Sequence, residues 1–83
     1  MEIKNLMESL VFDALEQVAP DFDADDDARL DAACYVLNRL QPRYAGSTRG
    51  IARLTREIHQ DHQVQVDILR LANEAMRRVT TTR

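Results

Sequence analysis

The sequence predicts an all-α fold, a small domain of three or four helices. Apolar residues recur at intervals of three and four along most of the chain, which is the spacing of one helix face. No useful stretch alternates between apolar and polar residues with a period of two, so no strand is predicted. The 83 residues are expected to form one domain, 1–83, because the chain has room for only one.

Size and cysteine content together predict a homodimer, either intertwined or packed helix against helix. A single core near this length rarely supplies more than about 3–5 kcal/mol of stability, so small domains usually gain the rest from disulfides, metals or partner chains. The lone Cys34 excludes an internal disulfide, and a free thiol fits a reducing cytoplasm. No segment approaches the roughly 18 apolar residues of a membrane span, so we expect a soluble cytoplasmic protein without a membrane partner.

The first half of the chain predicts two helices joined by an acidic loop. The first helix covers about residues 2–19, and residues 20–27 form the loop, in which Asp25 or Asp26 caps the next helix. The second helix covers about residues 28–40 and is expected to be buried on most sides at the centre of the fold. Its main apolar face is predicted to consist of Leu30, Ala33, Cys34, Leu37 and Leu40, and a wider apolar arc adds Ala32, Tyr35 and Val36.

The second half predicts a loop followed by one helix or two. Pro42 ends the second helix, and two glycines make residues 41–50 a turn-rich connection. A helical pattern returns over residues 51–79 with a polar interruption at 59–63, and the tail 80–83 is expected to fray. The periodicity leaves open whether the interruption divides this pattern into two helices.

Charge is distributed unevenly along the chain, although the net charge is only −3. Residues 1–32 contain ten acidic and two basic residues, whereas residues 33–83 contain four acidic and nine basic residues. This polarity can steer an anionic ligand toward the C-terminal half or drive antiparallel association of two chains. The weakly acidic whole argues against nucleic acid as a partner.

No constellation of catalytic or metal-binding residues emerges, so we expect neither an enzyme nor a bound cofactor. No Ser/His/Asp or Cys/His arrangement and no Gly-rich phosphate loop is present. The acidic run from Asp21 has the first ligands of a calcium loop but lacks the glycine and the glutamate that complete one. His59 and His62 lack a third ligand unless Asp61 or a second chain contributes one. Cys34 has no activating neighbour and is predicted to be a core thiol.

The segment from Arg39 to Tyr44 holds the most informative group of polar side chains, two guanidinium groups and a phenol at a helix end and a proline turn. An arginine fork can grip phosphate oxygens or a guanine edge, and both Arg and Tyr can stack on a purine. In the structural alternative, Tyr44 packs on the edge of the core, while Arg39 and Arg43 contact the last carbonyls of the second helix or acids from the loop. Residue types alone favour this alternative.

Two blocks of sequence stand in a distinctive order. The first is Lys4-Asn5-Leu-Met-Glu8-Ser-Leu-Val, and the second runs from Arg29-Leu-Asp31-Ala through an Ala-rich helix to Leu-Asn38-Arg-Leu-Gln-Pro42-Arg43-Tyr44. Over about residues 3–50 this order resembles the ComFB family of late-competence proteins. The resemblance implies an all-helical, dimeric protein that binds cyclic di-GMP, and in some members also cyclic di-AMP, as a signal receptor in processes such as motility and competence.

Two departures from the family's pattern affect what is carried over. Some members hold a zinc ion with a cysteine cluster between the first two helices, but this chain has Asp21 to Asp27 there, so no zinc is expected. Gln41 replaces the first of two prolines and leaves Pro42 to set the turn.

The resemblance implies a cyclic-dinucleotide site at the matching positions, to which we add neighbours with suitable chemistry. Arg39 and Arg43 would take phosphate or the Hoogsteen edge of guanine, and Tyr44 would stack on the base. Asn5 and Glu8 would read guanine N1, N2 and O6; the alternative for the amide and acidic side chains is a polar network between helices. The candidate residues are Lys4, Asn5, Glu8, Arg29, Asp31, Asn38, Arg39, Pro42, Arg43, Tyr44, Ser47 and Arg49.

The leading hypothesis is therefore a homodimeric receptor that binds a cyclic dinucleotide and passes its occupancy to an unknown downstream protein. The alternative is a protein-interaction or dimerisation module without a small ligand, in which the segment 51–79 pairs with its copy or with another protein.

Overall fold

The computed structural model describes residues 3–81, and within them four α-helices pack together beside two short strands. The all-α class is confirmed, whereas the expectation of no strand is wrong, because two pairs of residues form a minimal antiparallel sheet. Residues 1, 2, 82 and 83, which include the predicted start of the first helix and the end of the tail, lie outside the described part. The elements are β1 (Lys4–Asn5), α1 (Met7–Val18), the 3₁₀ turn η1 (Ala19–Asp21), α2 (Asp26–Leu37), β2 (Tyr44–Ala45), α3 (Thr48–Gln60) and α4 (His62–Thr81).

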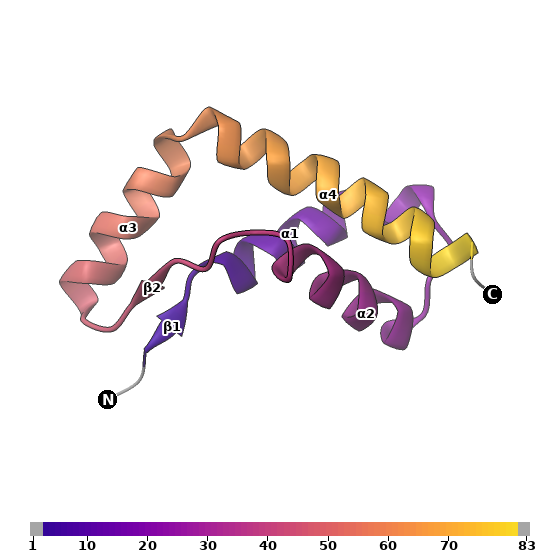
Figure 1. The fold of residues 1–83 in the computed structure, drawn as a ribbon, viewed down its shortest axis with the longest axis horizontal. Helices are drawn as coiled ribbons and strands as arrows, with labels where there is room; N and C mark the ends of the chain where they lie inside the picture. Colours follow the sequence, from indigo (N-terminus) through magenta and orange to yellow (C-terminus); the bar gives the residue numbers. More distant parts are fainter. Residues whose placement is uncertain (1–2, 82–83) are drawn as a thin grey trace.

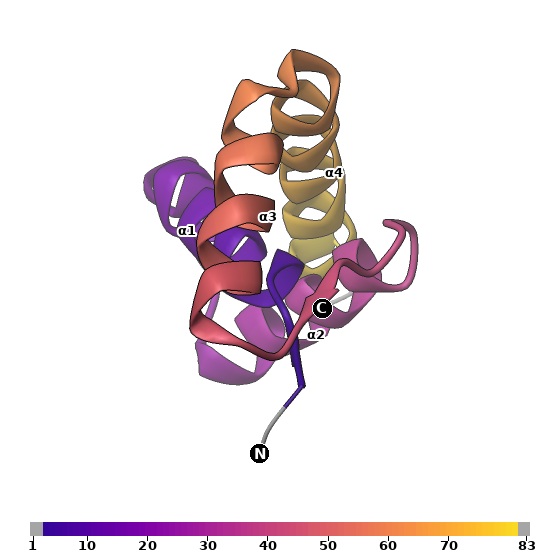
Figure 2. The same ribbon diagram turned by 90° about the vertical axis from the view of Figure 1, so that its left-hand side faces the viewer.

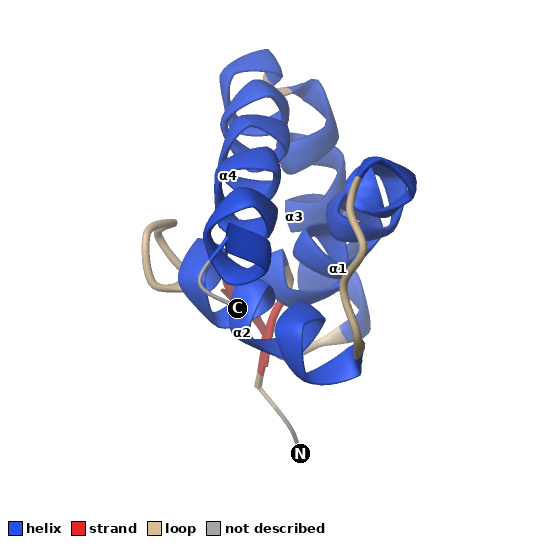
Figure 3. Cartoon of the chain, turned by 90° about the vertical axis from the view of Figure 1, so that its right-hand side faces the viewer, coloured by secondary structure: helices blue, strands red, loops and turns tan. Residues whose placement is uncertain are grey.

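Helix α4, rather than α2, forms the centre of the fold. It packs against both α1 and α2, and Figure 1 shows it lying across the two. Figures 2 and 3, viewed from opposite ends, show α4 above α2 and beside α1. Ala72, Ala75 and Met76 have no exposed surface, so the middle of α4 supplies the deepest part of the core.

The predicted face of α2 is correct only in part, since Ala33 is buried and Leu37 packs against the core, whereas two other members are exposed. Leu30 is 54% exposed and Cys34 is also exposed, so the prediction of a core thiol is wrong. A helix with apolar residues on every side has no periodic signal that selects a face, and small side chains let two helix backbones approach closely. The core therefore includes three alanines and Val36 of α2 but not Leu30. The buried residues of α2 are Ala28, Ala32, Ala33 and Val36.

The limits of the first two helices follow from local hydrogen bonds. Strand β1 occupies the residues before α1, so α1 begins at Met7 and not near residue 2. The Asp25 carboxylate accepts from the Ala28 N–H at 2.8 Å, which confirms the predicted cap of α2 and satisfies one of the donors that a helix start leaves unpaired. Helix α2 ends at Leu37, three residues before the predicted limit at Leu40.

The helical pattern after residue 51 forms two helices, which meet at Asp61. Asp61 has an extended backbone, and its carboxylate accepts from the Val64 N–H at 3.2 Å and so caps α4. Helix α4 then continues to Thr81, where the Thr80 hydroxyl donates to the Met76 carbonyl at 2.7 Å. Residues 80 and 81, which were predicted to belong to a frayed tail, are helical in this structure.

Helix α3 extends away from the other helices and contributes little to the core. Ile58 is its one buried residue, and the molecule measures 42 × 28 × 19 Å with α3 at one end of the long axis (Figure 1). Within residues 3–81, no helix is both long enough and apolar enough to cross a membrane.

The assigned face of α2 predicts a clear loss of stability for one substitution and little change for another. Ala32→Leu should lower the free energy of unfolding by about 1–3 kcal/mol, because Ala32 has no exposed surface and no space for a larger side chain. Leu30→Ala, on the exposed face, should change it by no more than about 0.5 kcal/mol. Urea unfolding monitored by circular dichroism measures both, and a larger loss in Leu30→Ala would contradict the assigned face.

Candidate functional site

Hydrogen bonds hold the start of the chain to the loop that follows α2. Lys4 pairs with Ala45 and Asn5 with Tyr44 in the two-stranded sheet. The Asn5 side-chain carbonyl accepts from the Arg43 N–H at 2.9 Å and from the Met7 N–H at 3.1 Å. The Leu6 N–H donates to the Arg43 carbonyl at 2.7 Å. Four of the predicted residues, Lys4, Asn5, Arg43 and Tyr44, are thereby brought together.

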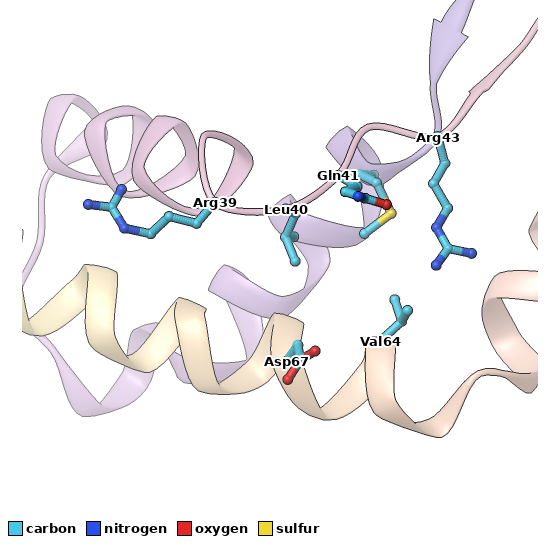
Figure 4. Close-up of a pocket in the computed structure, with 7 residues that line it drawn as sticks. Arg39, Leu40, Gln41, Arg43, Val64 and Asp67 are labelled. Carbon is cyan, nitrogen blue, oxygen red and sulfur yellow. The ribbon is translucent and has the colours of Figure 1, made fainter.

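A pocket of about 260 Å³ opens beside this junction. The loop after α2 forms one wall, the first turns of α4 form another, and the start of α1 closes the space between them (Figure 4). Apolar side chains supply much of the lining, and charged groups lie on both walls. The lining residues are Met7, Arg39, Leu40, Gln41, Arg43, Val64 and Asp67.

The Arg43 side chain points from the loop toward Val64 (Figure 4). Its guanidinium lies 3.7 Å from the carboxylate of Asp61, and the two side chains are 30% and 40% exposed. An ion pair this long and this exposed contributes little to stability. Because a guanidinium has five N–H donors, Arg43 keeps donors for a ligand in the pocket.

Arg39 is engaged with its own helix end. Its guanidinium donates to the Tyr35 carbonyl at 3.0 Å and lies 3.4 Å from the centre of the Tyr35 ring. Figure 4 shows its side chain running away from Arg43. The structural alternative considered above therefore describes Arg39 correctly. For Arg43 the acidic partner is Asp61 at the junction of α3 and α4, not a residue of the acidic loop.

Several predicted residues lie near the junction but do not line the pocket. Tyr44 is 62% exposed, so the expectation that it packs on the core edge is wrong, and its ring is accessible for stacking. The Ser47 hydroxyl caps α3 by accepting from the Gly50 N–H at 2.9 Å, and Arg49 is exposed in the first turn of that helix. Pro42 is exposed in the loop that carries Arg43.

The remaining predicted residues are not gathered into the pocket. Arg29 lies near the start of α2, in a shallow hollow with Pro20. Asp31, Asn38 and Glu8 are exposed, and their side chains make no hydrogen bond to any described residue, so the expected polar network between helices is not seen there. Among residues 3–81, no group of three or more His, Cys, Asp or Glu side chains is placed to hold a metal ion.

Sequence reasoning missed two acidic residues of this region. Asp61 stands three residues before Val64 in the polar interruption, which is the spacing of a helix N-cap, so a capping search would have found the boundary. Asp67 lies within α4 and reaches the pocket only because α4 packs beside the loop. No local pattern marks such a residue.

The hydrogen bonds of Asn5 predict a marked loss of stability in Asn5→Ala. The substitution leaves the N–H groups of Arg43 and Met7 without their acceptor, which should cost about 1–3 kcal/mol. Asn5→Asp keeps an oxygen acceptor and should retain most of that stability. Asn38→Ala is the matched control, and equal unfolding free energies for the two alanine variants would contradict a structural role for Asn5.

The chain was compared with known families, curated proteins and solved structures. No curated protein and no solved structure shows a significant match. The model of the family described as late competence development protein ComFB matches residues 4–83, so the similarity includes α3 and α4 as well as the blocks identified in the sequence. The chain therefore belongs to the ComFB family.

Proposed function

We propose that this protein is a receptor for a cyclic dinucleotide and that it acts as a homodimer. Cyclic di-GMP is the first candidate ligand. The observation that carries the proposal is the pocket beside Arg43, in a chain that belongs to the ComFB family. The proposal assigns no catalytic step and no cofactor to the protein. The receptor would pass its ligand occupancy to a downstream protein in the cytoplasm.

The lining of the pocket supports a nucleotide as the ligand. Arg43 offers charged donors suited to phosphate oxygens or to O6 and N7 of guanine. Leu40 and Val64 offer apolar surface for the faces of a base, and the exposed Tyr44 ring lies on the neighbouring strand for stacking. These groups match the mixed chemistry of a nucleotide, which joins a flat aromatic base to a charged phosphate.

The size of the pocket supports binding by a dimer. Pockets that enclose a drug-sized ligand measure about 300–1,000 Å³, so a pocket of about 260 Å³ suits one base with its phosphate. A cyclic dinucleotide has two equivalent halves, and a two-fold dimer presents two equivalent pockets. One ligand could then occupy both.

Exposed apolar side chains on the single chain also support dimerisation. Large apolar residues with at least 40% of their surface exposed occur on the first strand and on α1, α2, β2 and α4 or beside them. Coverage by a second copy would remove this surface from water. The residues are Ile3, Phe12, Leu30, Tyr44, Val66 and Leu69.

Isothermal titration calorimetry with cyclic di-GMP tests the proposed ligand, with cyclic di-AMP and linear GMP for comparison. We expect saturable binding selective for a cyclic dinucleotide. Arg43→Ala should weaken it by about 1.5–3 kcal/mol, because a charged hydrogen bond is lost. Arg77→Ala removes an exposed arginine outside the pocket and should leave the affinity unchanged. Equal affinities of the two variants would remove Arg43 from the site.

Sedimentation equilibrium tests the proposed dimer. The chain has a mass of 9.5 kDa, and we expect a species of twice that mass in the presence of saturating cyclic di-GMP. If the protein binds the ligand but remains a monomer at all concentrations, the proposed dimer is contradicted and the protein is a monomeric receptor.

A protein-interaction module without a small ligand is the second candidate, and the position of α3 favours it. Helix α3 buries only Ile58 and projects from the helices that form the core, which leaves much of its surface available to a partner. The titration separates the two candidates, since an interaction module would give no heat and no thermal shift with any cyclic dinucleotide.

A further inference from the structure

The Asp67 carboxylate lies on the α4 wall of the pocket, and Arg43 descends from the opposite wall (Figure 4). The Oδ1 atom of Asp67 accepts from the side-chain amide of Gln63 at 2.9 Å and lies 3.8 Å from the guanidinium of Arg70. Both contacts involve Oδ1, so Oδ2 has no partner among the described residues. Asp67 is thus an oriented carboxylate with a free acceptor atom.

The two walls together complement the edges of guanine. Guanine presents the acceptors O6 and N7 on one edge, and the donors N1–H and N2–H₂ on the adjacent Watson–Crick edge. Arginine is the usual partner of O6 and N7, and an ionised carboxylate can accept two hydrogen bonds from neighbouring N–H groups. Adenine has a donor at N6 where guanine has O6, and it has neither the N1–H nor the N2 amine. A base between Arg43 and Asp67 would therefore be read as guanine.

A carboxylate is otherwise unfavourable at a site for an anionic ligand. Repulsion between Asp67 and the phosphates would weaken binding unless the carboxylate accepts hydrogen bonds from the ligand. The side chain is 33% exposed, so water screens this repulsion only in part. Removing the charge should therefore weaken ligand binding if Asp67 reads the base, and strengthen it if Asp67 only repels the phosphate.

We propose that Asp67 selects guanine over adenine by accepting hydrogen bonds from N1–H and N2–H of a base held in this pocket. The inference rests on the proposed receptor function and adds to it a residue that determines specificity.

Calorimetric titration of the wild-type chain and of Asp67→Asn with three cyclic dinucleotides tests the role. The ligands are cyclic di-GMP, cyclic di-AMP and the inosine analogue cyclic di-IMP, which lacks the N2 amine. Asp67→Asn should lower the affinity for cyclic di-GMP roughly tenfold to hundredfold, because charged hydrogen bonds are lost. Its affinity for cyclic di-AMP should stay constant or rise. Wild-type protein should bind cyclic di-IMP less tightly than cyclic di-GMP. In Asp67→Asn the affinities for these two ligands should differ by less than in the wild type.

Glu74→Gln is the matched control, because it removes the same charge from the same helix at a residue outside the pocket. It should leave the ratio of affinities for cyclic di-GMP and cyclic di-AMP unchanged. If the wild type binds and Asp67→Asn keeps the wild-type ratio, the role of Asp67 is overturned and the receptor function stands. If the wild type binds none of the three ligands, the receptor function fails and the role of Asp67 fails with it.

Discussion

The side-chain carbonyl of Asn5 joins two segments that lie 38 residues apart and accepts hydrogen bonds from both. One bond satisfies the first N–H of α1, and the other fixes the backbone of Arg43, so the loop after α2 is held at the start of α1. Bringing these two segments together has an entropic cost, which the two hydrogen bonds help to offset. The pocket exists because this loop, α1 and α4 are held in register, and Asn5 sets one side of that arrangement.

The other side of the arrangement is set by α4, which the core positions through small side chains. Alanines on α2 and α4 bring the two helices close, and Leu30 of α2 is left on its outer surface. The same packing carries Val64 and Asp67 to the pocket, although both lie far along the chain from Arg43. The site therefore depends on helix packing as much as on the segment 39–44 that contains Arg43.

These two constraints explain how far the sequence could predict the structure. Local signals placed the helices well, because the cap at Asp25 and the polar interruption near Asp61 depend only on neighbouring residues. The buried face of α2 was predicted only in part, because its apolar residues surround the helix and the contact with α4 decides that Ala32 rather than Leu30 is buried. The sheet between β1 and β2 has two residues in each strand, too few for any alternation to appear in the sequence.

The candidate site divides according to whether the polar atoms of each residue are already used. The Asn5 side-chain carbonyl accepts hydrogen bonds from two backbone N–H groups, the Ser47 hydroxyl caps α3, and Arg39 donates to a carbonyl in the last turn of α2. A residue pattern that resembles a binding motif can thus be required for the fold, because backbone groups need partners in every member of a family. Among the pocket residues, Arg43, Asp67 and Gln41 retain unused donors or acceptors, and Arg39 keeps part of its guanidinium. Asp67 could not be identified as a pocket residue before α4 was placed. The count of unused polar atoms, rather than the motif, therefore identifies where a ligand can form new hydrogen bonds.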